Sequence, residues 1–304
     1  MVIGKSIRVY LADATVTGIR YAELVNWTGH AIACPRNRLP ELTKWPEAGK
    51  QGIYFLFESR FWETKPKAYI GESENVSQRL ISHDRNKEFW NEAVIFTSKD
   101  ENLTKAHIKY LEASLVNLSK KAGRYELENG NTPPESSLPR ADRDAMEEFI
   151  VNLRMVLGIL GYPILEPIFE SKHDNNSSKL SENKISSVNI LNNLVFKINH
   201  LTAYGAVTDE GFVLKKGSQL SKANSVSVPR KLISIKEQLL VDGELIDDKD
   251  NLISTQDILF SSSSYAAAIV AGTSRSGPQS WKASNGETLK QLEDELIAGK
   301  DNII

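Results

Sequence analysis

The chain of 304 residues is long enough for two domains, and its composition, 40% hydrophobic and 25% charged, is typical of a globular protein with a buried core. A formal net charge of −2 excludes a surface that is basic throughout, so any nucleic-acid binding must come from local patches. One cysteine excludes an internal disulfide, and the sequence has neither a signal-peptide pattern nor an apolar run of ~20 residues, which predicts a cytoplasmic protein.

Composition divides the chain into four segments. Residues 1–45 mix alternating apolar positions with turn residues and predict a strand-rich N-terminal extension. Residues 46–169 carry the strands and helices of a first α+β domain. Residues 170–188 are rich in Ser, Asn and Lys and nearly free of large apolar groups, which indicates a linker. Residues 189–304 are predicted to form a second domain with strands and helices of its own.

The individual elements follow from periodicity and from capping residues. In the first domain, strands are predicted at 51–58, 67–71 and 92–98, and helices at 99–123 and 142–161. In the second domain, strands are predicted at 194–198 and 211–218, and helices at 230–243, 261–272 and 288–297. The sequence therefore predicts an α/β fold of the α+β type, with a small mixed or antiparallel sheet flanked by helices in the first domain.

The first two strands place polar side chains beside each other. If they pair as antiparallel neighbours, Tyr54 and Tyr69 can direct their hydroxyl groups toward one surface. Gly71 ends the second strand, where a glycine allows the backbone to turn and a ligand to approach. In the helix expected to follow, Arg79 and His83 are four residues apart and share a face.

A later helix supplies a carboxylate to this arrangement. On a helical wheel, Glu112 lies beside the apolar stripe, so we expect it to be partly buried at the edge of the core. A partly buried carboxylate needs a partner, and a divalent cation would serve. Tyr, Arg, His and Glu around one shallow site are suited to the hydrolysis of a phosphodiester. Taken singly, each of these residues is more often a packing or surface residue than a catalyst.

The motifs Gly52-Ile53-Tyr54 and Tyr69-Ile70-Gly71, followed by Arg79 and Glu112, resemble those of the GIY-YIG nuclease family. The motif resemblance covers residues 50–135. The wider chain resembles bacterial proteins of that family with a C-terminal DUF4357 domain, through the segments GFVLKKGS, FSSSSYAAAIVAG and SGPQSWKASNGETL. The resemblance implies a metal-dependent DNA endonuclease in DNA repair, restriction or defence.

The resemblance also implies a role for each matching residue. Tyr54 would act as the general base or orient the attacking water, and Tyr69 would help to position that water. Arg79 would bind the scissile phosphate, and His83 would contact the phosphate or the tyrosine. Glu112 would be the sole protein ligand of a Mg²⁺ or Mn²⁺ ion. The family also has an asparagine after the helix, for which Asn129 and Asn131 both qualify and Asn131 is preferred.

Two regions are candidates for contact with the DNA backbone. The long loop between the first two strands could contribute Lys65 and Lys67. No acidic residue occurs between Gly211 and Lys236, a segment that includes Lys215, Lys216, Arg230 and Lys231. A solvated basic face and a surface that follows phosphates are equally good interpretations of this second region.

Two hypotheses on function follow. The first is a GIY-YIG DNA endonuclease with a C-terminal accessory domain. The second is a non-catalytic or regulatory nucleic-acid-binding protein that retains the fold and binds through the basic segment. An unrelated hydrolase is not supported, because the sequence has no nucleophile elbow, P-loop or His-rich metal motif.

Overall fold

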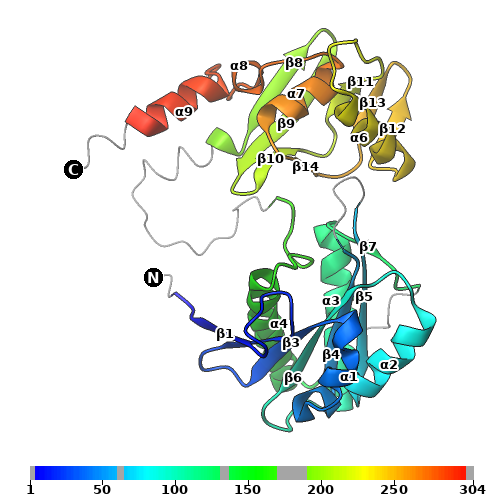
Figure 1. Ribbon diagram of the computed structural model, residues 1–304. Helices are drawn as coiled ribbons and strands as arrows, with labels where there is room; N and C mark the ends of the chain where they lie inside the picture. The colour runs from blue at the N-terminus through cyan, green and yellow to red at the C-terminus, as the bar shows by residue number, and fades with distance from the viewer. Residues whose placement is uncertain (1–3, 60–64, 131–136, 170–189, 299–304) are drawn as a thin grey trace. The chain divides into compact units, whose positions relative to one another are not determined.

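The computed structural model describes residues 4–59, 65–130, 137–169 and 190–298. The chain has two compact units, Met1–Pro167 and Ile168–Ile304, and each combines helices with sheets (Figure 1). The predicted α+β class is therefore confirmed. The predicted linker at 170–188 lies outside the described residues.

A seven-stranded sheet forms the centre of the N-terminal unit. Its strands lie in the order β1 (Ile7–Leu11), β2 (Arg20–Leu24), β3 (Gly29–Pro35), β6 (Glu92–Ser98), β4 (Gly52–Phe57), β5 (Lys67–Ser73) and β7 (Glu126–Leu127). All neighbours are antiparallel except β5 and β7, which are parallel. Strand β3 pairs with β6 along its whole length, so the strands of the first 45 residues belong to the same sheet as the predicted hairpin.

Helices cover both faces of this sheet. The long helices α3 (Lys105–Ala122) and α4 (Arg140–Ile159) pack with an apolar core on one face. A second core on the other face includes residues of α1 (Leu39–Leu42), η2 (Pro46–Gly49) and α2 (Val76–Asn86), while η1 (Arg36–Arg38) leads into α1. Every residue of β4 is buried, which explains why this strand has a continuous apolar sequence instead of an alternating one.

Local signals define the ends of the helices near the hairpin. The side chain of Asn75 accepts a hydrogen bond from the backbone N–H of Gln78 and caps α2. Thr104 and His107 form a capping box at the start of α3, and Gly123 ends that helix in the left-handed conformation. The predicted helix at 99–123 is confirmed from Lys105 to Ala122. The residues before Lys105 precede the helix, and Thr104 is its N-cap.

The C-terminal unit contains two sheets and four described helices. The strands are β8 (Leu194–Ile198), β9 (Leu201–Thr208), β10 (Gly211–Leu214), β11 (Gln219–Ser221), β12 (Leu245–Asp248), β13 (Asn251–Ser254) and β14 (Ile258–Phe260). They form the sheets β14-β10-β9-β8 and β11-β13-β12. The helices are α6 (Arg230–Val241), α7 (Ser263–Ala271), α8 (Gly277–Ser280) and α9 (Leu289–Ala298).

The core of this unit surrounds Trp281. Its side chain is fully buried, and its indole N–H donates a hydrogen bond to the carbonyl of Ser263. The three predicted helices and the strand at 194–198 are confirmed, whereas the strand predicted at 211–218 ends at Leu214. Among the described residues of either unit, no helix combines the length and the apolar character needed to cross a bilayer.

Candidate functional site

The register of the β4–β5 hairpin brings two tyrosines onto one face of the sheet. Tyr54 lies opposite Gly71, and Tyr69 lies opposite Leu56 on the same face. The ring centroids of Tyr54 and Tyr69 are 6.1 Å apart. Tyr54 is almost completely buried, at 1% exposure, whereas Tyr69 is partly exposed. The predicted convergence of the two rings is therefore present.

Glycine is required at two positions of this hairpin for steric reasons. A Cβ atom on Gly71 would lie 2.3 Å from the hydroxyl oxygen of Tyr54. A Cβ atom on Gly52 would lie 2.1 Å from the carbonyl oxygen of Phe96 on the neighbouring strand β6. The first glycine gives the Tyr54 ring its space, and the second allows β4 to lie against β6.

Helix α2 adds an arginine and a histidine to the two tyrosines. The Tyr54 hydroxyl and the Nε2 atom of His83 are hydrogen-bonded at 2.7 Å. The Nε atom of Arg79 donates to the same hydroxyl at 3.4 Å. His83 is 6% exposed, while Arg79 is exposed to solvent. A buried tyrosine–histidine pair therefore lies beneath a guanidinium group that a ligand can reach.

Burial keeps the tyrosine and the histidine neutral at pH 7. It raises the pKa of Tyr54 above its usual value, and Arg79 only partly opposes this effect. Burial, followed by the positive charges of Arg79 and Lys87, lowers the pKa of His83 to about 4. A neutral imidazole can accept the phenolic proton of Tyr54 through Nε2.

The outer edge of β5 is closed by a strand at one position and by a side chain at another. Strand β7 pairs with its beginning, at Lys67 and Ala68. The amide of Asn129 then takes the place of a strand: it donates to the carbonyl of Ile70 at 2.7 Å and accepts from the N–H of Ile70 at 3.1 Å. Near the next such position, the backbone of Glu72 lowers the pKa of the Glu112 carboxyl group, against the larger effect of burial.

This edge explains how Glu112 reaches the other candidate residues. Helix α3 covers the face of the sheet opposite to Tyr54, so its side chains are separated from the tyrosines by the sheet itself. Glu112 instead lies at the edge of β5, where the two faces meet. There its carboxylate is within electrostatic reach of Arg79. The structure thus brings Tyr54, Tyr69, Arg79, His83 and Glu112 to the same end of β5.

Glu112 has the properties of a carboxylate that can hold a cation. Its side chain is half-buried, and burial and the nearby carboxylate of Glu72 raise its pKa, against the effect of Arg79 and Lys109. No cluster of three or more potential metal ligands occurs among the described residues. Mg²⁺ is commonly bound through one or two carboxylates together with substrate phosphate and water, so Glu112 fits this ion without further protein ligands.

The remaining residues predicted near the hairpin have different positions. Lys67 forms an ion pair with Glu128 at 2.7 Å, and Lys65 lies just before β5. Asn131, the preferred asparagine of the sequence analysis, lies outside the described residues. Asn129, the alternative, contacts Ile70 of the second motif and holds the backbone of β5.

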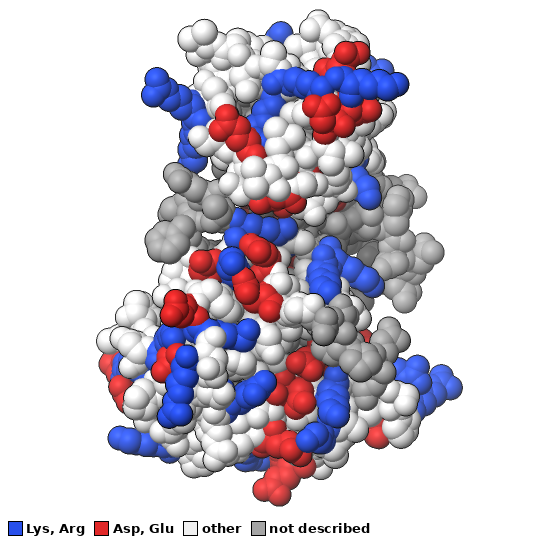
Figure 2. Space-filling view, turned by 90° about the vertical axis from the view of Figure 1, so that its right-hand side faces the viewer, with Lys and Arg blue, Asp and Glu red and all other residues white. Residues whose placement is uncertain are grey.

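Some basic side chains of the segment in the C-terminal unit are engaged in contacts within that unit, and others are exposed. Lys215 donates hydrogen bonds to Asn192 and Asn193, Lys222 pairs with Asp247, and Lys236 is buried with its amine on Asn224. Lys216, Arg230 and Lys231 are exposed. On the one face drawn in Figure 2, basic and acidic side chains are interspersed.

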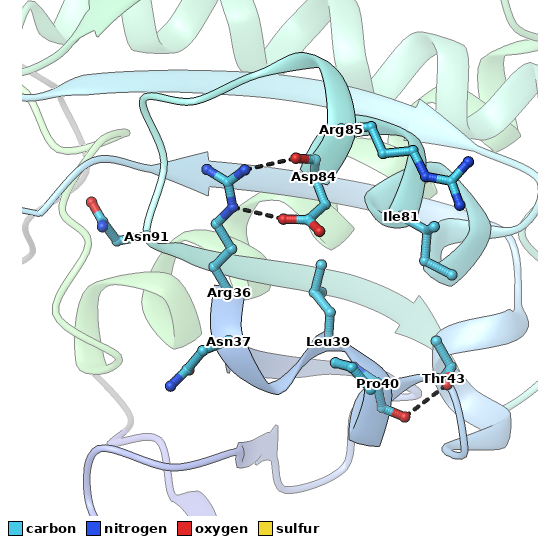
Figure 3. A pocket seen from close by; sticks show the side chains of 9 residues that line it. All are labelled: Arg36, Asn37, Leu39, Pro40, Thr43, Ile81, Asp84, Arg85 and Asn91. Carbon is cyan, nitrogen blue, oxygen red and sulfur yellow. Dashed lines mark hydrogen bonds and ion pairs between the residues drawn. The ribbon is translucent and has the colours of Figure 1, made fainter.

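A cavity of about 920 Å³ lies beside α2, away from the tyrosines (Figure 3). Arg36 spans it and binds Asp84 of α2, with 2.7 Å between Nε and the carboxylate and 2.7 Å between a terminal nitrogen and the carbonyl. The guanidinium of Arg36 also stacks on Trp90, 4.9 Å from the ring centroid. These contacts attach α2 to the segment before α1 and fix the helix that carries Arg79 and His83.

Comparison with known families gives one match. Residues 194–293 match the family described as "Domain of unknown function (DUF4357)". The chain contains a DUF4357 domain. This match includes β8 to β14 and the first half of α9, and it confirms the resemblance noted for that part of the sequence. Neither the curated proteins nor the solved structures include a match to this chain.

Sequence reasoning missed one cation of the site. Lys87 follows the last residue of α2, and its amine lies over the ring of Tyr69, 4.4 Å from the centroid. The signal was present in the sequence, because Lys87 follows Arg79 and His83 at the same interval of four residues, although it is the C-cap of α2 and not a helical residue. The approach of Glu112 to the backbone of Glu72 had no such signal, because it depends on how a later helix packs against the edge of β5.

The lowered pKa values of two buried histidines predict sensitivity to acid. His83 and His30, which is hydrogen-bonded to Thr97, both have a pKa of about 4 in the folded protein. The unfolded chain therefore binds more protons below about pH 6.5. Stability is retained above that pH and is lost as the pH falls toward 4, by up to about 3 kcal/mol per histidine.

Urea unfolding at pH 7.5 and at pH 4.5 measures this loss. The variant His83→Gln should lose less stability between the two pH values than the parent protein, because it lacks one of the two titrating groups. An equal loss in both proteins would contradict the assignment of His83.

Replacement of Asn129 by alanine should weaken the N-terminal unit. The change leaves the N–H and carbonyl of Ile70 without their partner, which costs roughly 1–3 kcal/mol. Thermal unfolding measures the effect, and Asn131→Ala is the matched control because it tests the other asparagine of the sequence analysis. A larger loss in Asn131→Ala than in Asn129→Ala would reverse the assignment.

Proposed function

We propose that the protein is a metal-dependent endonuclease of the GIY-YIG type that hydrolyses phosphodiester bonds in DNA, in DNA repair, restriction or defence. One observation carries the proposal. Tyr54, Arg79 and His83 form a hydrogen-bonded group at the same end of β5 to which Glu112 brings a carboxylate. The two tripeptide motifs supply the tyrosines and also the glycine that their packing requires.

Tyr54 and His83 would together take up the proton of the attacking water. His83 accepts the phenolic proton of Tyr54 through Nε2, which leaves the phenolic oxygen able to accept a proton in turn. Because Tyr54 has a raised pKa, a free phenolate is not the base at neutral pH. The water proton moves to the Tyr54 oxygen as the phenolic proton moves to His83, so that negative charge does not accumulate on the ring.

Arg79 and Glu112 would act on the phosphate. The exposed guanidinium of Arg79 can donate to the non-bridging oxygens while its Nε keeps the contact with Tyr54. Glu112 would hold Mg²⁺ or Mn²⁺, which when bound supplies positive charge to the phosphate and the leaving oxygen. Tyr69, next to Tyr54 and partly exposed, would position the water.

One observation favours the second candidate, a nucleic-acid-binding protein without catalysis. Tyr54 is 1% exposed, so in this conformation water has little access to its hydroxyl. This second candidate would bind nucleic acid through the basic segment of the C-terminal unit. Two lysines of that segment, Lys215 and Lys222, are engaged in contacts within the domain, which weakens this candidate. Cleavage therefore remains the better proposal, with binding as the outcome that would replace it.

A cleavage assay with the full chain separates these functions. The parent and Glu112→Gln are mixed with supercoiled plasmid, single-stranded DNA and RNA, in Mg²⁺, Mn²⁺ or EDTA. Cutting of either DNA that needs metal and is lost in Glu112→Gln supports the endonuclease. Tight binding without cutting in any metal supports the second candidate, cutting of RNA alone overturns the DNA assignment, and absence of both binding and cutting overturns both functions.

A further inference from the structure

One face of α2 carries Arg79 and His83 toward the tyrosines, and Lys87 follows at the C-cap of this helix. Arg79, His83 and Lys87 follow one another at intervals of four, so their side chains lie in a row along the helix. Arg79 contacts Tyr54, His83 contacts Tyr54 and lies 5.3 Å from the ring of Tyr69, and the amine of Lys87 lies over that ring. The row thus extends beyond the residues assigned to the proposed reaction.

The charge of this row is not neutralised by the helix itself. Asp84 is the one carboxylate of α2, and it is bound by Arg36 (Figure 3). Within the described part of the chain, no ion pair includes Lys87. Its amine is partly exposed and, above the Tyr69 ring, retains N–H groups that can donate to an anion.

A lysine at the end of a helix also interacts favourably with the helix dipole. That interaction requires only a cation near the last carbonyl groups, and the backbone N–H of Lys87 already binds the carbonyl of His83. It does not require the amine to lie 4.4 Å from the centre of an aromatic ring. The position over Tyr69 directs the charge toward the proposed reaction site instead.

We propose that Lys87, supported by the ring of Tyr69, is a second phosphate-binding subsite, which takes a phosphodiester of the DNA backbone next to the scissile one. The inference rests on the proposed function for its ligand, since it names the neighbour of the phosphate that Arg79 would bind. Lysine suits this role because it binds phosphate as a point charge, and the cation–π contact holds that charge in place.

Salt dependence of DNA binding tests the subsite without cleavage. Binding of a short duplex to the full chain is measured by fluorescence anisotropy in EDTA over a range of salt concentrations, for the parent and for Lys87→Gln, Lys87→Arg and Lys99→Gln. Lys99 is the matched control because its amine pairs with Glu23 on β2, which lies on the other side of β6 from β5. Each phosphate contact contributes about 0.9 to the slope of log K against log salt.

We expect Lys87→Gln to reduce the slope by about 0.9, with Lys87→Arg and Lys99→Gln close to the parent. An unchanged slope in Lys87→Gln, or an equal reduction in Lys99→Gln, overturns the subsite. If the parent binds and never cuts, the proposed function fails and the slopes still decide on Lys87. If the parent does not bind DNA, the subsite fails with it. A loss of folded protein alone does not reduce the slope. Thermal unfolding shows whether each variant is folded under the conditions of the binding measurement.

Discussion

Replacement of Arg79 by alanine is expected to reduce DNA cleavage by a factor of about 100 to 1,000 without loss of folded protein. The factor is that for removing one preorganised donor that stabilises charge in a transition state. Folding should be unaffected because the side chain is exposed and its one hydrogen bond to a described residue, at 3.4 Å to Tyr54, is long. Initial rates of plasmid nicking in Mg²⁺ measure the effect.

The neighbouring Arg85 offers a matched control. It is also exposed and on α2, but it lines the cavity beside Arg36, whose lining includes neither Tyr54 nor Tyr69 (Figure 3). Arg85→Ala should therefore retain cleavage within a few fold of the parent. If both variants lose activity equally, the effect reflects the total charge of α2, and the assignment of Arg79 to the scissile phosphate is wrong.

Replacement of Gly71 by alanine should damage both folding and cleavage. The added Cβ atom would lie 2.3 Å from the Tyr54 hydroxyl, and His83 holds that hydroxyl from the other side. Either the ring leaves His83 or strand β5 shifts, and overpacking of this kind costs about 1–3 kcal/mol. Thermal unfolding and plasmid nicking together measure the two effects.

Gly158→Ala is the opposite control. Gly158 lies in α4 and has no atom within 4 Å of the position of an added Cβ. Alanine is favoured over glycine in a helix by up to about 1 kcal/mol, so this variant should unfold at a higher temperature than the parent. Destabilisation by both replacements would show that the Gly71 effect does not depend on the Tyr54 ring.

The candidate site was predictable to the extent that it depends on local periodicity. The hairpin places Tyr54 and Tyr69 on one face because of strand alternation, and the four-residue spacing of Arg79 and His83 places both on one face of α2. The same rule would have given Lys87. These relations hold within one element or between two adjacent ones, and such relations are the ones that a sequence encodes most directly.

Relations between distant elements were not predictable in the same way. The parallel pairing of β5 with β7, and the approach of Glu112 to the backbone of Glu72, depend on how a helix and a loop return to a sheet edge. The surroundings of the basic segment were not predictable for a related reason. Absence of acidic residues in one stretch says nothing about Asp247, which lies 25 positions from Lys222 and pairs with it.

The edge of β5 is closed by the single side chain of Asn129 at Ile70, whereas a strand closes it at Lys67 and Ala68. This side chain can move without unfolding the sheet, so the amide proton of Ile70 is protected independently of the rest of the ladder. Hydrogen exchange at Ile70 therefore reports whether the Asn129 amide is bound to the strand. The middle residue of the second motif thus contains a backbone indicator of the state of this edge.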